Sequence, residues 1–410
     1  MKSYVISICG AGGKTTILIK LALYYAKKNY KVAVLTTTHM CHIKSKYFDC
    51  YGVDAGSGKI GYIGDEEYKR VCKEYDYIII EADGSRTKPM KIPNDKKEPV
   101  IPDNTNEIHI VFGAQAIGRK ISAVCHRYES AFDNINENIN QNTNKEILEV
   151  LHNKDKIVDE HILKLFMKYF YINPLKNKYK NIKIYSHIVD LSKSNNYKKY
   201  KNISFVLMAS GSSIRFGENK LLYKINNKKM YEIVLDTLNN TKLNIIKYFK
   251  QKFNYDLNIQ IVLVTSHKEI IEEQKSSNKQ IVLYNDNANE GLSSTIRIST
   301  EYLKNNTDAI CYVPGDLIGL KQNEFESFIR LSLLSNNDIS CFVSNYQLSS
   351  PTFIQKKFFD KAMEVKGDKG LRELIKEKKF EAFLYHILEE DFLDIDTKED
   401  LKKFKEEDIK

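Results

Sequence analysis

The sequence lacks the cysteine pairs that a disulfide framework or a zinc site would need. Its seven cysteines are odd in number, and no two of them form a Cys-x-x-Cys pair. It also lacks any apolar run of 18 residues, and its first residues lead into a strand-like segment without the apolar core of a signal peptide. We therefore expect a soluble protein of a reducing cytoplasm, with no membrane partner.

Length and charge limit the number of domains and the kind of ligand. The chain has 410 residues, of which 42% are hydrophobic, so it is long enough for two or three domains with cores of their own. The formal net charge of +10 favours anionic ligands. Because the lysines are spread through the sequence rather than gathered in one motif, nucleic acid is not expected as a partner.

A strand, a glycine-rich turn and a helix are predicted in succession over residues 4–28. The turn Gly10-Ala-Gly-Gly-Lys14-Thr-Thr resembles a P-loop, although Ile8 stands where the full Walker pattern has glycine. Backbone N–H groups at the helix start would face a phosphate, Lys14 would supply charge, and Thr15 would hold Mg²⁺. The sequence thus predicts a site for ATP or GTP, formed by Gly10, Gly12, Gly13, Lys14, Thr15 and Thr16.

Carboxylates follow another strand predicted in this half of the chain. The apolar run at residues 75–80 ends in Glu81-Ala-Asp83, as a Walker-B strand would. Ligands of α/β proteins bind at the carboxyl ends of parallel strands, so these side chains are expected near the glycine-rich turn. Asp83 is the predicted metal ligand of this site, with Glu81 as the alternative.

Several phrases of the first 130 residues together resemble the YqeC family, accessory proteins of selenium-dependent molybdenum hydroxylases. Besides the glycine-rich turn, they are Thr36-Thr-Thr-His39, Lys88-Pro-Met-Lys91, Gly113-Ala-Gln-Ala-Ile-Gly118 and His126-Arg127. The resemblance implies a P-loop domain that binds a nucleoside triphosphate, and it makes a molybdenum hydroxylase apoenzyme a candidate partner. No Asn-Lys-x-Asp element follows an apolar strand, so specificity for guanine is not indicated.

A polar stretch without periodicity separates the two halves. Residues 191–202 contain few apolar side chains and are predicted to be a linker. The expected domains are therefore a P-loop domain at 1–190 and a second domain at 203–410.

The second half alternates predicted strands and helices. Strands are predicted at 203–208, 259–266, 280–284, 309–313 and 338–343, and helices at 229–238, 293–305, 323–334 and 370–377. The fold class expected for the whole chain is α/β, with a Rossmann-like second domain whose sheet is mostly parallel.

The stretch from Val206 to Leu222 joins a strand end, a turn of small residues and two cations. It resembles the signature loop of the MobA/MocA-like NTP transferases, the nucleotidyltransferases of molybdenum cofactor synthesis, except that Ser210 replaces Ala or Gly. The resemblance implies catalytic roles for Arg215 and Lys220. It implies nucleotide binding by Ala209, Ser210, Gly211, Ser213 and Gly217.

Four further motifs of this family have counterparts here. Gly315-Asp316 resembles its Gly-Asp-x-Pro motif, with Ile318 in place of proline, which implies that Asp316 is a catalytic Mg²⁺ ligand. Asp394 and Asp396, in a segment near the C-terminus, are further implied metal ligands. Two other segments imply acceptor binding by Gly291, Ser293, Ser294, Gly367, Asp368 and Arg372.

The implied reaction is Mg²⁺-dependent transfer of a nucleotidyl group to molybdopterin or molybdenum cofactor, with release of pyrophosphate. CTP is favoured over GTP, because Lys220-Leu-Leu and the Gly367-to-Arg372 loop resemble the cytidylyl branch more closely. Two alternatives stay open. One is a nucleotidyltransferase acting on sugar or alditol phosphates, and the other is a cofactor carrier or insertion chaperone without transferase activity.

Overall fold

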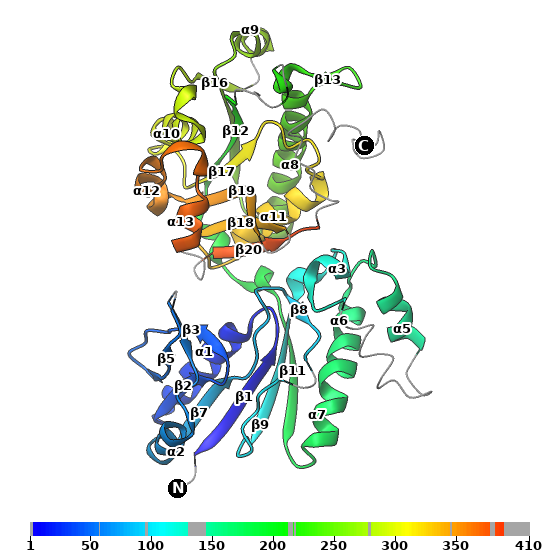
Figure 1. Cartoon of the computed structure of the whole chain (residues 1–410), viewed down its shortest axis with the longest axis vertical. Helices are drawn as coiled ribbons and strands as arrows, with labels where there is room; N and C mark the ends of the chain where they lie inside the picture. The colour runs from blue at the N-terminus through cyan, green and yellow to red at the C-terminus, as the bar shows by residue number, and fades with distance from the viewer. Residues whose placement is uncertain are drawn as a thin grey trace. The chain divides into compact units, whose positions relative to one another are not determined.

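The chain forms two compact units, Met1–Leu191 and Ser192–Lys410, each built around a sheet of its own (Figure 1). The computed structural model describes residues 3–56, 58–94, 97–129, 145–211, 216, 219–277, 280–344, 347–377 and 382–388. Both units alternate strands with helices, so the predicted α/β class with mostly parallel sheets is confirmed. Within those ranges, no helix is long and apolar enough to cross a membrane.

The first unit contains a six-stranded sheet with the strand order β11-β9-β1-β7-β2-β4, in which all neighbours are parallel. Its strands are β1 (Tyr4–Gly10), β2 (Val32–Thr36), β3 (His39–Cys41), β4 (Asp49–Cys50), β5 (Val53–Asp54), β6 (Lys59–Gly61), β7 (Tyr77–Glu81), β8 (Met90–Lys91), β9 (Glu107–Gly113), β10 (Cys125–His126) and β11 (Lys183–Val189). Its helices are α1 (Lys14–Ala26), α2 (Asp65–Glu74), α3 (Ile121–Val124), α5 (Lys145–His152), α6 (Glu160–Met167) and α7 (Asn173–Lys178).

Strand β1 lies inside this sheet because its sequence is apolar on both faces. Val5, Ile6 and Ile8 are fully buried, as expected for a strand that is covered on both sides. Helix α1 starts directly after the glycine-rich turn and packs Leu18 and Ala22 against the sheet. The turn is thereby held at the carboxyl end of β1.

A continuous helical run covers residues 160–178 of the first unit, where no element is predicted from the sequence. A π-helical turn, Lys168–Ile172, joins α6 to α7. Such turns alter the direction of side chains and are frequent at functional sites. Here the turn carries Tyr171, whose ring is fully buried and packs edge-on against Phe112.

The second unit contains a seven-stranded sheet with the strand order β16-β15-β12-β17-β19-β18-β20. Its strands are β12 (Asn202–Ala209), β13 (Lys224–Ile225), β14 (Lys228–Lys229), β15 (Asn258–Thr265), β16 (Ile281–Tyr284), β17 (Ala309–Pro314), β18 (Ile339–Ser344), β19 (Gln347–Gln355) and β20 (Ala382–His386). Its helices are α8 (Met230–Phe253), α9 (Lys268–Ser277), α10 (Leu292–Leu303), α11 (Gln322–Leu334), α12 (Phe359–Met363) and α13 (Arg372–Glu377).

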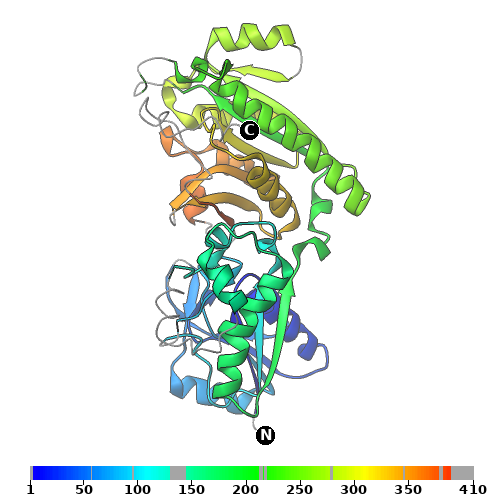
Figure 2. The ribbon, with the colours of Figure 1, turned by 90° about the vertical axis from the view of Figure 1, so that its right-hand side faces the viewer.

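Helices cover both faces of this sheet, because alternate residues of β12 are apolar on each side. Val206 and Met208 belong to the core that contains Ile296 of α10. Phe205 points to the other face, where its ring contacts that of Phe325 on α11. Figure 2 shows the green α8 along the sheet, and α11 packs against it.

The structure departs from the expected second half in several elements: α9, α12 and β20 were not predicted, and two others differ in ways that bear on the sheet. Helix α8 continues to Phe253, well beyond the predicted 229–238. Strand β19 was not predicted, and it runs antiparallel to both β17 and β18. Pro351 lies in β19 where the pairing with β18 changes register. The regular hydrogen bonds between the two strands are interrupted there, so a residue without an N–H group is tolerated.

Residues 192–202, most of the predicted linker, are folded onto the second unit. The Tyr197 ring is buried and stacks on Phe253 at a centroid distance of 4.6 Å. Tyr200 is 1% exposed, and its hydroxyl accepts a hydrogen bond from Gln355 at 2.6 Å. Two tyrosines in a polar stretch thus anchor it, a tertiary contact that periodicity does not reveal.

Candidate functional site

Two predicted catalytic groups of the second unit, Lys220 from the 3-10 turn Lys220–Leu222 and Asp316 from the end of β17, lie together. Lys220 Nζ lies 2.5 Å from Asp316 Oδ2, and their side chains are 11% and 21% exposed. The two loops meet closely, because the Gly315 N–H donates to the Met208 carbonyl at 2.8 Å. A Cβ on Gly315 would lie 3.0 Å from the same carbonyl oxygen, so the approach depends on glycine.

The small-residue turn after β12 is anchored from the neighbouring strand β15. Thr265 Oγ1 donates to the Ala209 carbonyl at 2.8 Å, and Ser210 Oγ donates to the Val264 carbonyl at 3.3 Å. The ring Nε2 of His267 lies 3.2 Å from the Gly211 carbonyl oxygen. Ser210 and Gly211, the described start of this turn, are therefore held at the edge of the sheet where β12 ends.

The predicted acceptor residues meet at the start of α10. Asp368 Oδ1 accepts the backbone N–H of Leu292 at 3.2 Å, so the Gly367-Asp368 loop caps this helix. Ser293 and Ser294 lie inside the first turn of α10 and donate back to the carbonyls of Glu290 and Gly291. Asp368 had been predicted only as an acceptor-binding residue.

Gly291 and Arg372 complete the acceptor set. A Cβ on Gly291, whose φ is +83°, would lie 2.3 Å from Asp368 Oδ1, so only glycine allows this capping contact. Arg372 begins α13 and is exposed. Ser213, Arg215, Gly217, Asp394 and Asp396 lie outside the described residues.

The predicted phosphate loop of the first unit is packed tightly onto its own sheet. Gly10, Gly12 and Gly13 have φ values of +100°, +63° and +127°. A Cβ on Gly10 would lie 2.3 Å from the Val111 carbonyl oxygen, so this approach again requires glycine. No side chain caps α1, so the backbone N–H groups of its first turn, which includes Thr15 and Thr16, offer donors to an anion.

Lys14 is buried between carboxylates from the end of β7. Its Nζ lies 3.8 Å from Glu81 Oε1 and 3.5 Å from Asp83 Oδ1, and it donates to the Gly10 carbonyl at 3.0 Å. Burial alone would lower the pKa of Lys14, but the two carboxylates outweigh burial and raise it. Lys14 is therefore protonated and lies directly beneath the glycine-rich loop.

Asp83 and Glu81, the two candidate metal ligands, have different surroundings. Asp83 is fully buried, and its Oδ2 accepts from Gly10 N at 3.0 Å and from Tyr171 Oη at 3.1 Å. Lys91 Nζ lies 3.4 Å from the same oxygen. Glu81 Oε2 instead accepts from Thr15 Oγ1 at 3.4 Å, so the Thr15–Glu81 pair fits a metal ion better than the enclosed Asp83.

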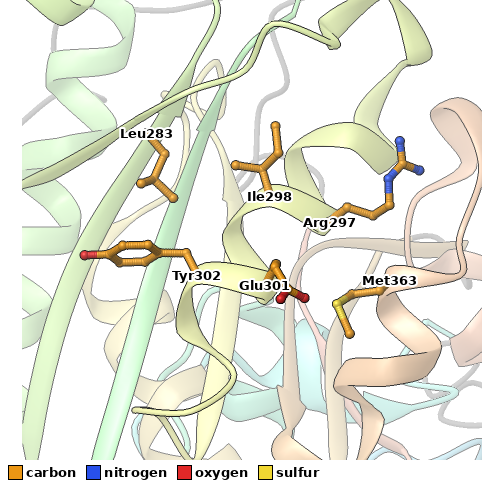
Figure 3. A pocket seen from close by; sticks show the side chains of 6 residues that line it. All are labelled: Leu283, Arg297, Ile298, Glu301, Tyr302 and Met363. Carbon is orange, nitrogen blue, oxygen red and sulfur yellow. The ribbon is translucent and has the colours of Figure 1, made fainter.

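A separate depression of about 560 Å³ lies beside α10 (Figure 3). Its lining residues are Leu283, Arg297, Ile298, Glu301, Tyr302 and Met363. This set includes no predicted site residue. The depression is thus distinct from the strand ends that carry the candidate chemistry.

Family models match both units of the chain. Residues 6–129 match the YqeC protein family, and residues 205–382 match the MobA-like NTP transferase domain. The chain joins a YqeC domain to a MobA-like NTP transferase domain. The family resemblances identified in the sequence are thereby confirmed for each domain.

One curated relative matches the YqeC domain. The uncharacterized protein YqeC of Escherichia coli (strain K12) is 33% identical over 153 residues, which cover 32% of this chain. The match spans 59% of the length of that relative.

Solved structures resemble about half of the chain. A homolog of Mycobacterium tuberculosis rv0371c from Mycobacterium sp. strain JC1 has a TM-score of 0.40 and 18% identity, covering 49% of this chain and 93% of its own. A nucleotidyl transferase from Methanothermobacter has a TM-score of 0.40 and 16% identity, covering 50% and 97%. Molybdopterin-guanine dinucleotide biosynthesis protein A from Archaeoglobus fulgidus has a TM-score of 0.35 and 14% identity, covering 49% and 95%.

Proposed function

We propose that the transferase domain moves a nucleotidyl group from a nucleoside triphosphate to molybdopterin or molybdenum cofactor and releases pyrophosphate. The observation that carries this proposal is the Lys220–Asp316 pair, which lies where the turn after β12 meets the turn after β17. Such an edge of a parallel sheet is where α/β proteins bind nucleotides. CTP is the proposed donor, on the resemblance of the Lys220 and Gly367-to-Arg372 segments to the cytidylyl branch.

The transfer requires positioning and charge neutralisation rather than a covalent intermediate. A phosphate oxygen of the acceptor attacks the α-phosphorus, the bond from the α-phosphorus to the bridging oxygen breaks, and the electron pair leaves with pyrophosphate. Backbone N–H groups of the turn that begins at Gly211, together with Arg215, hold the β- and γ-phosphates. Lys220 faces the α-phosphate, where negative charge develops.

Asp316 is the described residue that fits a divalent cation in this domain. Its carboxylate is partly exposed at the sheet edge, with Oδ2 bound to Lys220. A bound Mg²⁺ would offset the charge that develops on the phosphates. Lys220, paired with the same carboxylate, would face the α-phosphate from beside the metal ion.

We further propose that the YqeC domain binds ATP or GTP at its glycine-rich loop and acts in the maturation of a selenium-dependent molybdenum hydroxylase. Lys14, already charged and buried beneath the loop, faces the phosphates, and Thr15 with Glu81 supplies oxygen ligands for a metal ion.

The transferase proposal is tested by offering the full chain labelled CTP or GTP with molybdopterin, molybdenum cofactor or a panel of sugar phosphates. We expect pyrophosphate release with CTP and a pterin acceptor, and a product whose mass is increased by that of CMP. A sugar phosphate that reacts faster would make the chain a sugar-phosphate nucleotidyltransferase. Release that never exceeds background would favour a cofactor carrier or chaperone.

A further inference from the structure

Cations of the YqeC domain lie around one buried histidine that is not part of the glycine-rich loop. His126, in β10, is 5% exposed. The charges of Arg127, Lys91, Arg86 and Lys88 all act on its ring. The backbone fixes this group, since β10 pairs with β8 and the Ile92 N–H donates to the His126 carbonyl at 3.0 Å. The His126-Arg127 motif has no role in the nucleotide site proposed above.

The His126 ring presents a polar atom that the protein does not satisfy. Among the described residues, no hydrogen-bond partner lies within reach of its buried Nδ1. A buried polar atom without a partner costs about 1–3 kcal/mol, so such atoms are retained where a ligand or water completes them. Burial, followed by the four neighbouring cations, lowers the pKa of His126 to about 3. The ring is therefore neutral and can donate one N–H without adding charge.

Carboxylates only partly balance this cationic group. Glu98 Oε2 is shared by Arg127 at 2.5 Å and Lys91 at 2.6 Å. Lys88 Nζ donates to the backbone carbonyls of Ser122 at 3.2 Å and Cys125 at 3.4 Å, which are neutral acceptors. Asp83 and Glu129 also act on Lys91 and Lys88, and Asp83 is shared with Lys14. Cationic side chains beside a neutral ring favour an anion there.

Asp83 connects this group to the glycine-rich loop. Its Oδ2 lies 3.4 Å from Lys91 Nζ, while its Oδ1 lies 3.5 Å from Lys14 Nζ. One buried carboxylate is therefore shared by the phosphate lysine of the loop and by a cation of the histidine group. The glycine-rich loop and the group around His126 are therefore neighbouring sites that share Asp83.

From this arrangement we propose that His126, Arg127 and the cations beside them form a second anion site in the YqeC domain, distinct from its nucleotide loop. It takes the phosphate group of a small-molecule substrate, with the His126 ring donating or accepting one hydrogen bond and Arg127 donating in a charge-assisted pair. Glu98 holds Arg127 in position until the anion arrives. The site goes beyond the nucleotide binding proposed above and does not depend on it.

The test follows the His126 ring directly, because other parts of the chain also bind phosphate. The full-length protein is labelled at the Cε1 carbons of histidine, and the His126 signal is assigned with His126→Asn. Inorganic phosphate is then added against sodium chloride of equal ionic strength. We expect a saturable shift of the His126 signal with phosphate and none with chloride.

Variants separate this site from the nucleotide loop. Arg127→Gln, at a side chain that is 27% exposed, should weaken the phosphate response about tenfold or more. Arg86→Gln, at an exposed position, tests the same charge dependence if Arg127→Gln fails to fold. Arg70→Gln is the matched control, since Arg70 pairs with Glu67 on the surface of α2, and it should leave the response unchanged.

Two results would overturn the proposal. The first is a His126 signal that does not move with phosphate, or that moves with the same affinity in both arginine variants. The second is loss of the response in Lys14→Ala, since the ring would then report binding at the glycine-rich loop. Retention of the response in Lys14→Ala supports a separate site, whether or not the loop binds a nucleotide.

Discussion

Replacing Lys220 by alanine should have opposite effects on metal binding and on catalysis. Lys220 Nζ lies 2.5 Å from Asp316 Oδ2, so it should compete with a divalent cation for this carboxylate when no nucleotide is added. Exposed ion pairs contribute about 0–1 kcal/mol to the stability of a protein, whereas removing one partner of a buried pair lowers that stability by about 3–5 kcal/mol. The side chains of Lys220 and Asp316 are 11% and 21% exposed, so their pair lies between these two limits. We therefore take about 1–3 kcal/mol as the free energy of interaction between Lys220 and Asp316.

That free energy corresponds to a gain of about 5- to 150-fold in the affinity of Lys220→Ala for a divalent cation. The measurement is titration of the nucleotide-free protein with Mn²⁺, followed by electron paramagnetic resonance. Asp316→Asn identifies the signal that belongs to this site. Nucleotidyl transfer by Lys220→Ala should nevertheless fall by about 10²-fold or more, the usual cost of losing one preorganised charge-stabilising group.

Lys228→Ala is the matched control for this experiment. Lys228 pairs with Asp236 at 2.6 Å in the same domain, but their side chains are 60% and 51% exposed. Its removal should change neither Mn²⁺ affinity nor transfer. An Mn²⁺ affinity of Lys220→Ala equal to that of the wild type would refute the reasoning, because Lys220 would then not compete for Asp316. A rise in KM with unchanged kcat would mean that Lys220 binds only the ground state.

Three further predictions concern single positions. Asp316→Asn should abolish pyrophosphate release while the thermal midpoint stays close to that of the wild type, and wild-type turnover at saturating Mg²⁺ would contradict its metal role. Gly10→Ala should lower the free energy of unfolding, measured in urea, by about 2 kcal/mol or more, because the new Cβ would lie 2.3 Å from the Val111 carbonyl oxygen. Gly56→Ala is the control: Gly56 also has a positive φ but open space around it, so the loss of stability should be smaller. Lys14→Ala should abolish calorimetric binding of ATP or GTP to the YqeC domain and leave transfer by the full chain unchanged, whereas loss of transfer would mean that the two domains share one active site.

The sequence predicted those parts of the site whose signals are local. Apolar runs followed by glycines predicted β1, β12 and the turns after them, and the Gly315-Asp316 motif predicted the end of β17. Parallel topology places Asp316 at the carboxyl end of β17 beside β12, whereas Lys220 reaches it from the 3-10 turn Lys220–Leu222, which is separated from β12 by ten residues.

The missed features depend on contacts between residues that are distant in the chain. Tyr171 reaches Asp83 across a sequence separation of 88 residues, from a π-helical turn that has no motif. Strand β19 was missed because Pro351 and the neighbouring serines interrupt its apolar pattern, and only the change of register against β18 makes room for the proline. Neither feature produces a periodic pattern of apolar residues in the sequence.

The packing of Tyr197 and Tyr200 decides where the chain can be cut. A fragment that starts at residue 203, the boundary suggested by composition, would lose two aromatic rings from the base of the transferase domain. It would leave apolar surface on Phe249 and Phe253 without cover, which invites aggregation of a domain that is otherwise complete. A fragment that starts at Ser192 keeps both rings. For domain exchange between related proteins, the natural junction therefore precedes the polar stretch instead of lying within it.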